Sequence, residues 1–233
     1  MKYGINEGCK TQCVLSLGSG TRMQYVGKIF GIGFHKTGTT SLTLALQQLG
    51  YKAIHGDGYG TWSHADEGRT LLKFIERGDY RLPTFELFDA FLDNPYFSIW
   101  PQIYRLYPEA KFILTVREER DWIESCTKYF ADRRVRPMQQ WKFGDSANPS
   151  KSESARQKWI QLYRQHNSSI MQHFDGLDHQ FLVMDIAQGD GWDKLCKFLE
   201  APIPHKHFPR ANRRKRWNLR SLLRRVARNS KQR

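Results

Sequence analysis

The stretch Lys28-Ile-Phe-Gly-Ile-Gly-Phe-His-Lys-Thr-Gly-Thr-Thr-Ser-Leu42 joins an apolar run, a short loop of glycines and hydroxyl residues around one lysine, and the start of a helical pattern. A buried strand that ends in a loop at a helix N-terminus aims several backbone N–H groups at one point, together with the positive end of the helix dipole. An anion fits at that point. The stretch therefore predicts a site for a phosphorylated ligand between a strand and a helix.

The side chains of this loop strengthen the prediction. Gly33 and Gly38 permit backbone conformations and close approaches that a Cβ would hinder. Lys36 supplies a mobile positive charge, and hydroxyl donors surround it at Thr37, Thr39, Thr40 and Ser41. An ordinary strand, turn and capped helix is the plain alternative, because Thr and Ser cap helices in many proteins. The density of glycine, lysine and hydroxyl residues favours the phosphate loop.

The order of residues in the loop narrows the choice of ligand. A nucleoside triphosphatase has the pattern G-x-x-x-x-G-K-[ST], in which the lysine follows the second glycine. Here Lys36 precedes Gly38, and Thr39 stands where that lysine would be. The order therefore argues against an ATPase or a kinase.

The reordered segment His35-Lys-Thr-Gly-Thr-Thr-Ser-Leu42 closely resembles the 5′-phosphosulfate loop of sulfotransferases that use 3′-phosphoadenosine 5′-phosphosulfate (PAPS). The resemblance implies that Lys36 is catalytic and that the loop binds the 5′ end of PAPS through His35, Lys36, Thr37, Gly38, Thr39, Thr40 and Ser41. It also implies a second site, in which an arginine at the end of a central strand and a serine about two helical turns later hold the 3′-phosphate.

Both residues of that second site are present. Lys111-Phe-Ile-Leu-Thr-Val-Arg117 is a β-prone run that ends in arginine, and the helical pattern that follows reaches Ser125. A metal-dependent nucleotide enzyme needs a carboxylate at this place to hold magnesium, whereas arginine pairs with phosphate directly. We therefore expect no metal cofactor. Taken alone, Arg117 and Ser125 favour a surface ion pair and a solvated hydroxyl, whereas together with the first loop they favour the phosphate site.

A general base for the acceptor is predicted between these two segments. The run Leu87-Phe-Asp-Ala-Phe-Leu-Asp-Asn-Pro95 ends at acidic residues and proline, where the resembling family often carries His-x-Pro or a glutamate. Asp93 occupies that place and is the predicted catalytic base. Asp89 is a nearby competitor. Alternatively, Asp93 caps a helix that starts near Pro95.

A fourth match to the family lies late in the chain. Residues 181–186, 191–199 and 202–209 resemble the family's last strand, its short helix and its proline-rich exit. Relatives often place a tyrosine near the position of Met184, and a methionine cannot donate the same hydrogen bond to the nucleotide. The contacts to adenine stay unassigned.

Composition is that of one globular domain. The chain has 233 residues, of which 39% are hydrophobic, and no apolar run approaches the ~20 residues of a membrane span. The four cysteines show neither metal-ligand spacing nor a disulfide framework, which suggests a reducing compartment. We expect a leader at residues 1–27, a catalytic domain at 28–204 and a cytoplasmic location, because no anchor is visible.

Alternating strand and helix patterns predict an α/β fold, a three-layer sandwich with a mainly parallel sheet and helices on both faces. The largest irregular segment, residues 131–152, is rich in arginine and aromatic residues, and we expect it to border the acceptor site as a lid or binding loop. Strands are expected at residues 28–34, 51–55, 85–88, 111–117 and 181–184, and helices at 40–49, 63–77, 96–106, 118–125, 153–174 and 192–199.

The positive charge is concentrated in a tail at residues 205–233. This tail carries 12 Lys and Arg and no acids, which leaves only +2 of the formal net charge of +14 for the rest of the chain. Leu219, Leu222, Leu223 and Val226 have helical spacing, so a basic amphipathic helix is expected. It would dock on the enzyme, an anionic membrane or an acidic partner, or stay solvated. No groove-reading motif supports binding to nucleic acid.

The sequence thus predicts a sulfotransferase that moves a sulfuryl group from PAPS to a hydroxyl or amine of a small molecule or glycan. Two other classes stay open. A P-loop kinase would use ATP with magnesium, and a binding module would hold the nucleotide without turnover.

Overall fold

The structure, a computed structural model, describes residues 25, 27–56 and 67–211, and its core is one parallel sheet. The predicted leader lies outside these residues except for Tyr25 and Gly27, as does the predicted tail helix. The strand order is β2-β3-β1-β4-β5, and every neighbouring pair is parallel. The strands are β1 (Ile29–Gly31), β2 (Ala53–His55), β3 (Ala90–Leu92), β4 (Lys111–Thr115) and β5 (Phe181–Met184).

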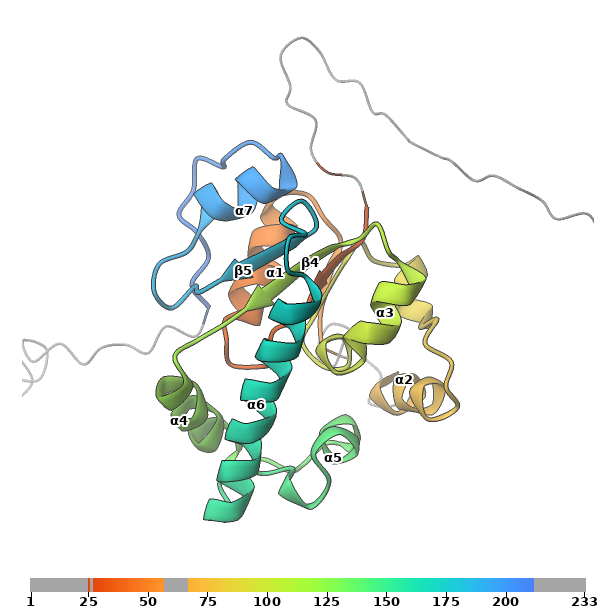
Figure 1. Cartoon of the computed structure of the whole chain (residues 1–233), viewed down its shortest axis with the longest axis vertical. Helices are drawn as coiled ribbons and strands as arrows, with labels where there is room; N and C mark the ends of the chain where they lie inside the picture. The colour runs from red at the N-terminus through yellow and green to blue at the C-terminus, as the bar shows by residue number, and fades with distance from the viewer. Residues whose placement is uncertain (1–24, 26, 57–66, 212–233) are drawn as a thin grey trace, which may run out of the picture.

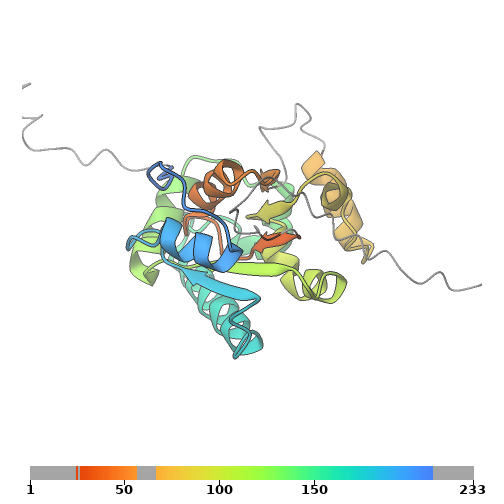
Figure 2. The same cartoon turned by 90° about the horizontal axis from the view of Figure 1, so that it is seen from above.

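Helices cover both faces of the sheet, so the predicted three-layer α/β architecture is confirmed. One face packs on α1 (Thr39–Gln48) and α7 (Trp192–Leu199). The other packs on α2 (Glu67–Glu76), α3 (Trp100–Leu106) and α6 (Glu153–His173). Figure 2 shows α1 and α6 on opposite sides of the strands. Near the far end of α6, α4 (Glu119–Phe130) and α5 (Pro137–Phe143) complete the fold (Figure 1). In the described ranges, no helix has the length and apolar character to cross a membrane.

The middle strand alternates between the two layers, as a strand buried on both faces must. Ile29 packs in the core under α1 and α7, whereas Phe30 packs in the core under α3 and α6. The Phe30 ring stacks between Phe91 of β3 and Phe112 of β4, at centroid distances of 5.0 and 5.6 Å. These three residues are register partners, so strand register and ring stacking fix each other.

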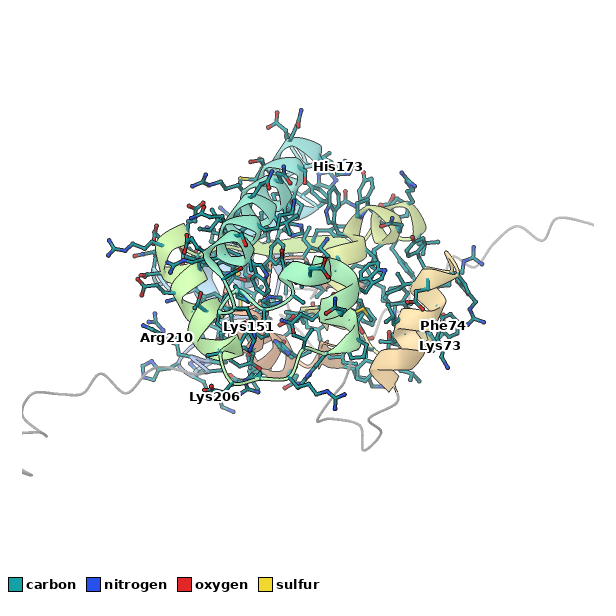
Figure 3. All side chains as sticks on the ribbon, turned by 90° about the horizontal axis from the view of Figure 1, so that it is seen from below. Lys73, Phe74, Lys151, His173, Lys206 and Arg210 are labelled. Atoms are coloured by element: carbon teal, nitrogen blue, oxygen red, sulfur yellow. The ribbon has the colours of Figure 1, made fainter. Side chains whose placement is uncertain are left out.

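On the face of the sheet that α2, α3 and α6 cover, α3 packs against the C-terminal end of α6. His173, labelled in Figure 3, lies 4.5 Å from the ring of Tyr104 and 5.1 Å from that of Trp100, centroid to centroid. Phe174 follows and stacks on Phe181 of β5. The long helix α6 is thus held against the sheet at one end, and its other end extends beyond the carboxyl edge of the strands.

The predicted strand at residues 85–88 is wrong. This segment forms a 3-10 helix (Pro83–Glu86), and the strand comes later, at Ala90–Leu92. Pro83 starts the 3-10 turn, and Phe85 packs edge-on against Phe30 from that turn. Aromatic residues produced the strand-like pattern, but their burial comes from a turn that lies on the core.

The irregular loop predicted at residues 131–152 is also partly wrong. Its middle forms α5 and a 3-10 turn (Gly144–Ser146). Pro137 occupies the first turn of α5, and Met138 and Phe143 are buried in two parts of the core. This helix is only about two turns long, and so short an apolar pattern cannot be recognised as helical from the sequence.

Other predicted elements are confirmed, with their bounds shifted at most by a few residues. β5 and α7 agree with the predicted strand 181–184 and helix 192–199. The segment predicted as one helix at residues 96–106 consists of a 3-10 turn (Tyr96–Ile99) followed by α3.

The junction between β1 and the following loop is held tightly by its neighbours. The carbonyl of Ile32 accepts a hydrogen bond from Nε2 of His166 on α6, at 2.7 Å. A Cβ on Gly33 would lie 2.2 Å from Oγ1 and 2.4 Å from the carbonyl oxygen of Thr115. The loop therefore crosses the end of β4 at a distance that only glycine allows.

Replacement of Gly33 by alanine should reduce stability strongly. The added Cβ forces the loop away from the backbone of Thr115, and we expect a loss of about 1–3 kcal/mol in the free energy of unfolding, measured by urea denaturation. Gly191→Ala is the control, since its Cβ would have its nearest contact at 3.5 Å, an ordinary distance. Equal losses in the two variants would contradict the close crossing.

His166 should make the protein sensitive to mild acid. Burial lowers the pKa of His166 from 6.5 to about 4, although its hydrogen bond to Ile32 opposes this. Between these pH values the unfolded chain binds a proton that the folded chain excludes, so stability falls as pH decreases, by at most about 1.4 kcal/mol per pH unit.

Thermal unfolding of His166→Gln tests this, because the glutamine amide can still donate to Ile32 but does not titrate. We expect the variant to lose less stability than the wild type between pH 6.5 and pH 4. The exposed His179 provides the control His179→Gln. An acid sensitivity that His166→Gln leaves unchanged would contradict this role.

Candidate active site

The predicted site residues gather at the carboxyl edge of the sheet. The loop with Lys36 follows β1, Asp93 follows β3, and Arg117 comes two residues after β4. His55, which the sequence analysis did not select, ends β2. Because all strands are parallel, these ends meet at one edge, which is where α/β folds bind ligands.

The N-terminus of α1 opens toward this edge without a side-chain cap among the described residues. Gly38 is the N-cap, with φ 112°, and no side chain accepts a hydrogen bond from the first turn. A Cβ on Gly38 would also lie 3.2 Å from Ile186. The first N–H groups of α1 thus lack the usual internal acceptor, and an anion can supply it.

The loop hydroxyls divide into two groups. The hydroxyl of Thr37 donates to the carbonyl of Phe34 at 2.5 Å and lies 2.6 Å from Oγ1 of Thr115. That of Ser41 accepts from the backbone N–H of Ala211 at 3.0 Å. Thr37 and Ser41 are both buried, so their hydroxyls brace the loop. Backbone N–H groups and Lys36 remain as the main donors for an anion.

His35 points beneath the loop. Its side chain lies among aromatic rings, with the centroid of Trp159 at 5.1 Å and that of Phe130 at 5.3 Å. Nδ1 is 3.7 Å from Oδ1 of Asp93, whereas Nε2 is buried without a hydrogen-bond partner among the described residues. The imidazole of His35 therefore faces Asp93 and the core.

Lys36 is held in a left-handed backbone conformation, with φ 69°. Its Nζ lies 4.0 Å from the ring centroid of Tyr129, and the guanidinium of Arg133 lies 4.1 Å from the same centroid. Burial lowers the pKa of Lys36, and the like charges of Arg133 and Arg117 add to that, while Cys126 and Asp93 oppose it. The lysine is partly desolvated, which strengthens its attraction to an anion.

Arg117 is fixed through its backbone and has an unsatisfied side chain. Tyr163 accepts a hydrogen bond from its N–H at 3.0 Å and donates to its carbonyl at 2.8 Å. Nε of Arg117 is buried without a partner in the described part of the chain. Its ion pair to Asp121 is long, at 4.0 Å. Ser125 lies partly exposed on α4, two turns along the helix that follows.

Asp93 is the centre of a polar cluster and does not cap the next helix. Its Oδ1 accepts from the N–H of Asn94 at 2.7 Å, and its Oδ2 accepts from Oγ1 of Thr39 at 3.2 Å. Nε2 of His55 lies 3.3 Å from Oδ2. Asp89, the competing carboxylate, precedes β3 at the opposite edge of the sheet and accepts from the N–H of Lys52.

The charge state of Asp93 is set by this cluster. Burial raises its pKa, but the His35 and His55 rings and the N–H of Asn94 together lower it well below the usual range. The carboxylate is therefore ionised at neutral pH and firmly held.

Backbone strain is concentrated at the two predicted catalytic residues. Among the described residues, three other than glycine have positive φ, and two of these are Lys36 and Asp93, at 69° and 71°. Such conformations cost free energy and persist where the surroundings impose them. They turn both side chains away from the direction that a continuing strand would give them.

Two residues near the site, His55 of β2 and Tyr129 of α4, were missed by sequence reasoning. Of these, only His55 had a usable signal, since it is a titratable residue at the end of a predicted strand. Arg133 belongs to the arginine-rich segment 131–152, which was expected to border the acceptor site, and it lies over the same Tyr129 ring as Lys36. In the part of the chain that the structure describes, no group of three or more His, Cys, Asp or Glu side chains is arranged to hold a metal ion.

Comparison with known proteins agrees with this geometry. A family model described as a sulfotransferase domain matches residues 28–217, which includes every strand and helix described above. The chain is also similar to Ava biosynthesis cluster protein M of Aspergillus versicolor, with 23% identity over 211 residues that cover 78% of this chain and 79% of that protein. The chain therefore belongs to the sulfotransferase domain family and is a PAPS-dependent transferase.

Proposed function

We propose that the protein transfers the sulfuryl group of PAPS to a hydroxyl or amine of a small acceptor. The observation that supports this is a pair of positive donor groups at the ends of neighbouring strands, β1 and β4. In the described part of the chain, the N-terminus of α1 beside Lys36 has no side-chain cap, and the buried Nε of Arg117 has no hydrogen-bond partner. A donor with phosphates on both sides of its ribose would satisfy both.

In this proposal the loop N–H groups and Thr40 hold the 5′-phosphate, and Arg117 with Ser125 holds the 3′-phosphate. The acceptor oxygen or nitrogen forms a bond to sulfur while the bond between sulfur and the bridging phosphate oxygen breaks. Lys36 neutralises the charge that develops on this oxygen. Base catalysis depends on Asp93, which lies beside the loop through Thr39.

The acceptor is proposed to bind beside the segment around Asp93, with α5 as a neighbouring wall of its site. Nδ2 of Asn94 donates to the carbonyl of Met138 on α5 at 3.3 Å, so the two segments are in contact. The relative in Aspergillus versicolor is named for a biosynthesis cluster, which supports a small-molecule acceptor over a glycan.

Nucleotide binding separates this proposal from a kinase. Adenosine 3′,5′-bisphosphate without metal should raise the melting temperature, and ATP with magnesium should have a smaller effect at equal concentration, because Arg117 would lack its phosphate. Stabilisation by ATP with magnesium alone would contradict the proposal and favour the kinase. Binding without turnover of PAPS would favour a non-catalytic module.

Lys36→Ala should abolish sulfuryl transfer, since no other group neutralises the leaving oxygen in this scheme. The measurement is the release of adenosine 3′,5′-bisphosphate from PAPS, and we expect a loss of at least ~100-fold in kcat. The exposed Lys151 gives the control Lys151→Ala, which should keep the wild-type rate. A Lys36→Ala variant with normal turnover would refute the assignment.

As pH rises, donor binding should begin to weaken at a lower pH than it would if Lys36 had the pKa of an ordinary lysine. The pKa of Lys36 is lowered by burial, so the lysine loses its proton, and with it the attraction to the 5′-phosphate, as pH rises. Calorimetric titration with adenosine 3′,5′-bisphosphate at pH 7 and pH 9 measures this. Lys36→Arg stays charged and should show a weaker pH dependence. Identical pH profiles for the two proteins would contradict it.

A further inference from the structure

His55 lies next to Asp93 and has no role in the reaction scheme proposed above. Its Nε2 lies 3.3 Å from Oδ2 of Asp93, 3.0 Å from Oγ1 of Thr39 and 3.2 Å from Oγ1 of Thr40. One ring nitrogen of His55 is therefore committed to the loop and to Asp93. It connects the end of β2 to the start of α1, where the 5′ end of the donor would bind.

Asp93 is poorly suited to take a proton from the acceptor itself. Its oxygens already accept from Asn94 and Thr39, and its side chain is only 14% exposed. Its strongly lowered pKa also means that it has little affinity for a proton at neutral pH. A general base works best when its proton affinity matches the working pH.

His55 has the complementary properties. Its side chain is 34% exposed, more than twice the exposure of Asp93. Because the hydroxyl of Thr39 donates to Asp93, its oxygen accepts from Nε2 of His55, so Nε2 carries the proton and Nδ1 the free lone pair. The carboxylate of Asp93, 3.3 Å from Nε2, would hold the ring in this tautomer through Thr39 and would stabilise the positive charge that the ring gains with a proton.

The other histidine of the cluster cannot replace it. His35 is 8% exposed, its Nδ1 faces Asp93, and its Nε2 is enclosed among aromatic rings. It contacts Oδ1 of Asp93, whereas His55 contacts Oδ2. Among the described residues, the titratable groups that interact with Asp93 are thus His35, His55, Lys36 and Cys126, the last two through electrostatic interactions.

We propose that His55 is the catalytic base and that Asp93 is its positioning residue, a refinement that rests on the proposed sulfuryl transfer. Nδ1 of His55 takes the proton of the acceptor O–H or N–H. The freed electron pair forms the bond to sulfur, and the bond from sulfur to the bridging oxygen breaks. Its electron pair stays on the 5′-phosphate of adenosine 3′,5′-bisphosphate. This couples a histidine of β2 to a carboxylate of β3 across two adjacent strand ends.

A kinetic experiment tests the role of His55 with 2-naphthol as acceptor probe and PAPS as donor. We expect His55→Gln to lower kcat by about 100- to 10,000-fold, the usual contribution of a general base, and to leave the affinity for adenosine 3′,5′-bisphosphate within about twofold. The exposed His207 provides the control His207→Gln, which should keep the wild-type kcat. A kcat of His55→Gln close to that of the wild type would overturn the proposal.

A spectroscopic experiment tests the pairing without any acceptor. In protein with ¹⁵N-labelled histidine, His55, assigned by its loss in His55→Gln, should be the Nε2–H tautomer with an exchange-protected N–H proton. That protection should be lost in Asp93→Ala and kept in Asp89→Ala. An Nδ1–H tautomer, or protection that survives in Asp93→Ala, would overturn the pairing. If the wild type fails to bind adenosine 3′,5′-bisphosphate, the proposed donor site is wrong. The spectrum of His55 still tests its pairing with Asp93 in that case.

Discussion

The N-terminus of α1, which no side chain of the described residues caps, is held at the end of the central strand. Its position requires the Gly33 crossing over Thr115, the positive φ of Lys36 and Gly38, and the hydrogen bond from His166 to Ile32. Each of these costs conformational freedom or strain. The first N–H groups of α1 have no side-chain acceptor among the described residues, and an anionic ligand would supply one. The protein therefore loses stability at the same place where it can bind an anion.

The hydroxyl residues show how the fold and the site share one segment. The side chains of Thr37 and Ser41 hold the loop to β4 and to the segment after α7. Those of Thr39 and Thr40 instead contact Asp93 and His55 at the ends of β3 and β2. A dense run of hydroxyls is therefore needed even though few of them face the ligand. The loop is the structural link between the donor site and the proposed base.

Much of the fold could be predicted because its strong signals are local. β5 and α7 have clear apolar patterns with turn residues at both ends, and Arg117 follows a run that can only be a buried strand. Phe85 misled the prediction because a 3-10 turn buries an aromatic residue as well as a strand does. His55 and Tyr129 reach the site through strand order and helix packing, which no spacing in the sequence records.

The proposed function requires two separate phosphate sites, one at the end of β1 and one at the end of β4, and calorimetry with a matched pair of nucleotides can detect the second. Adenosine 3′,5′-bisphosphate and AMP differ only in the 3′-phosphate. We expect the wild type to bind the bisphosphate at least ~10-fold more tightly, since a charge-assisted hydrogen bond contributes about 1.5–3 kcal/mol. Arg117→Gln should bind both nucleotides almost equally. An Arg117→Gln variant that prefers the bisphosphate as strongly as the wild type would show that Arg117 does not hold the 3′-phosphate.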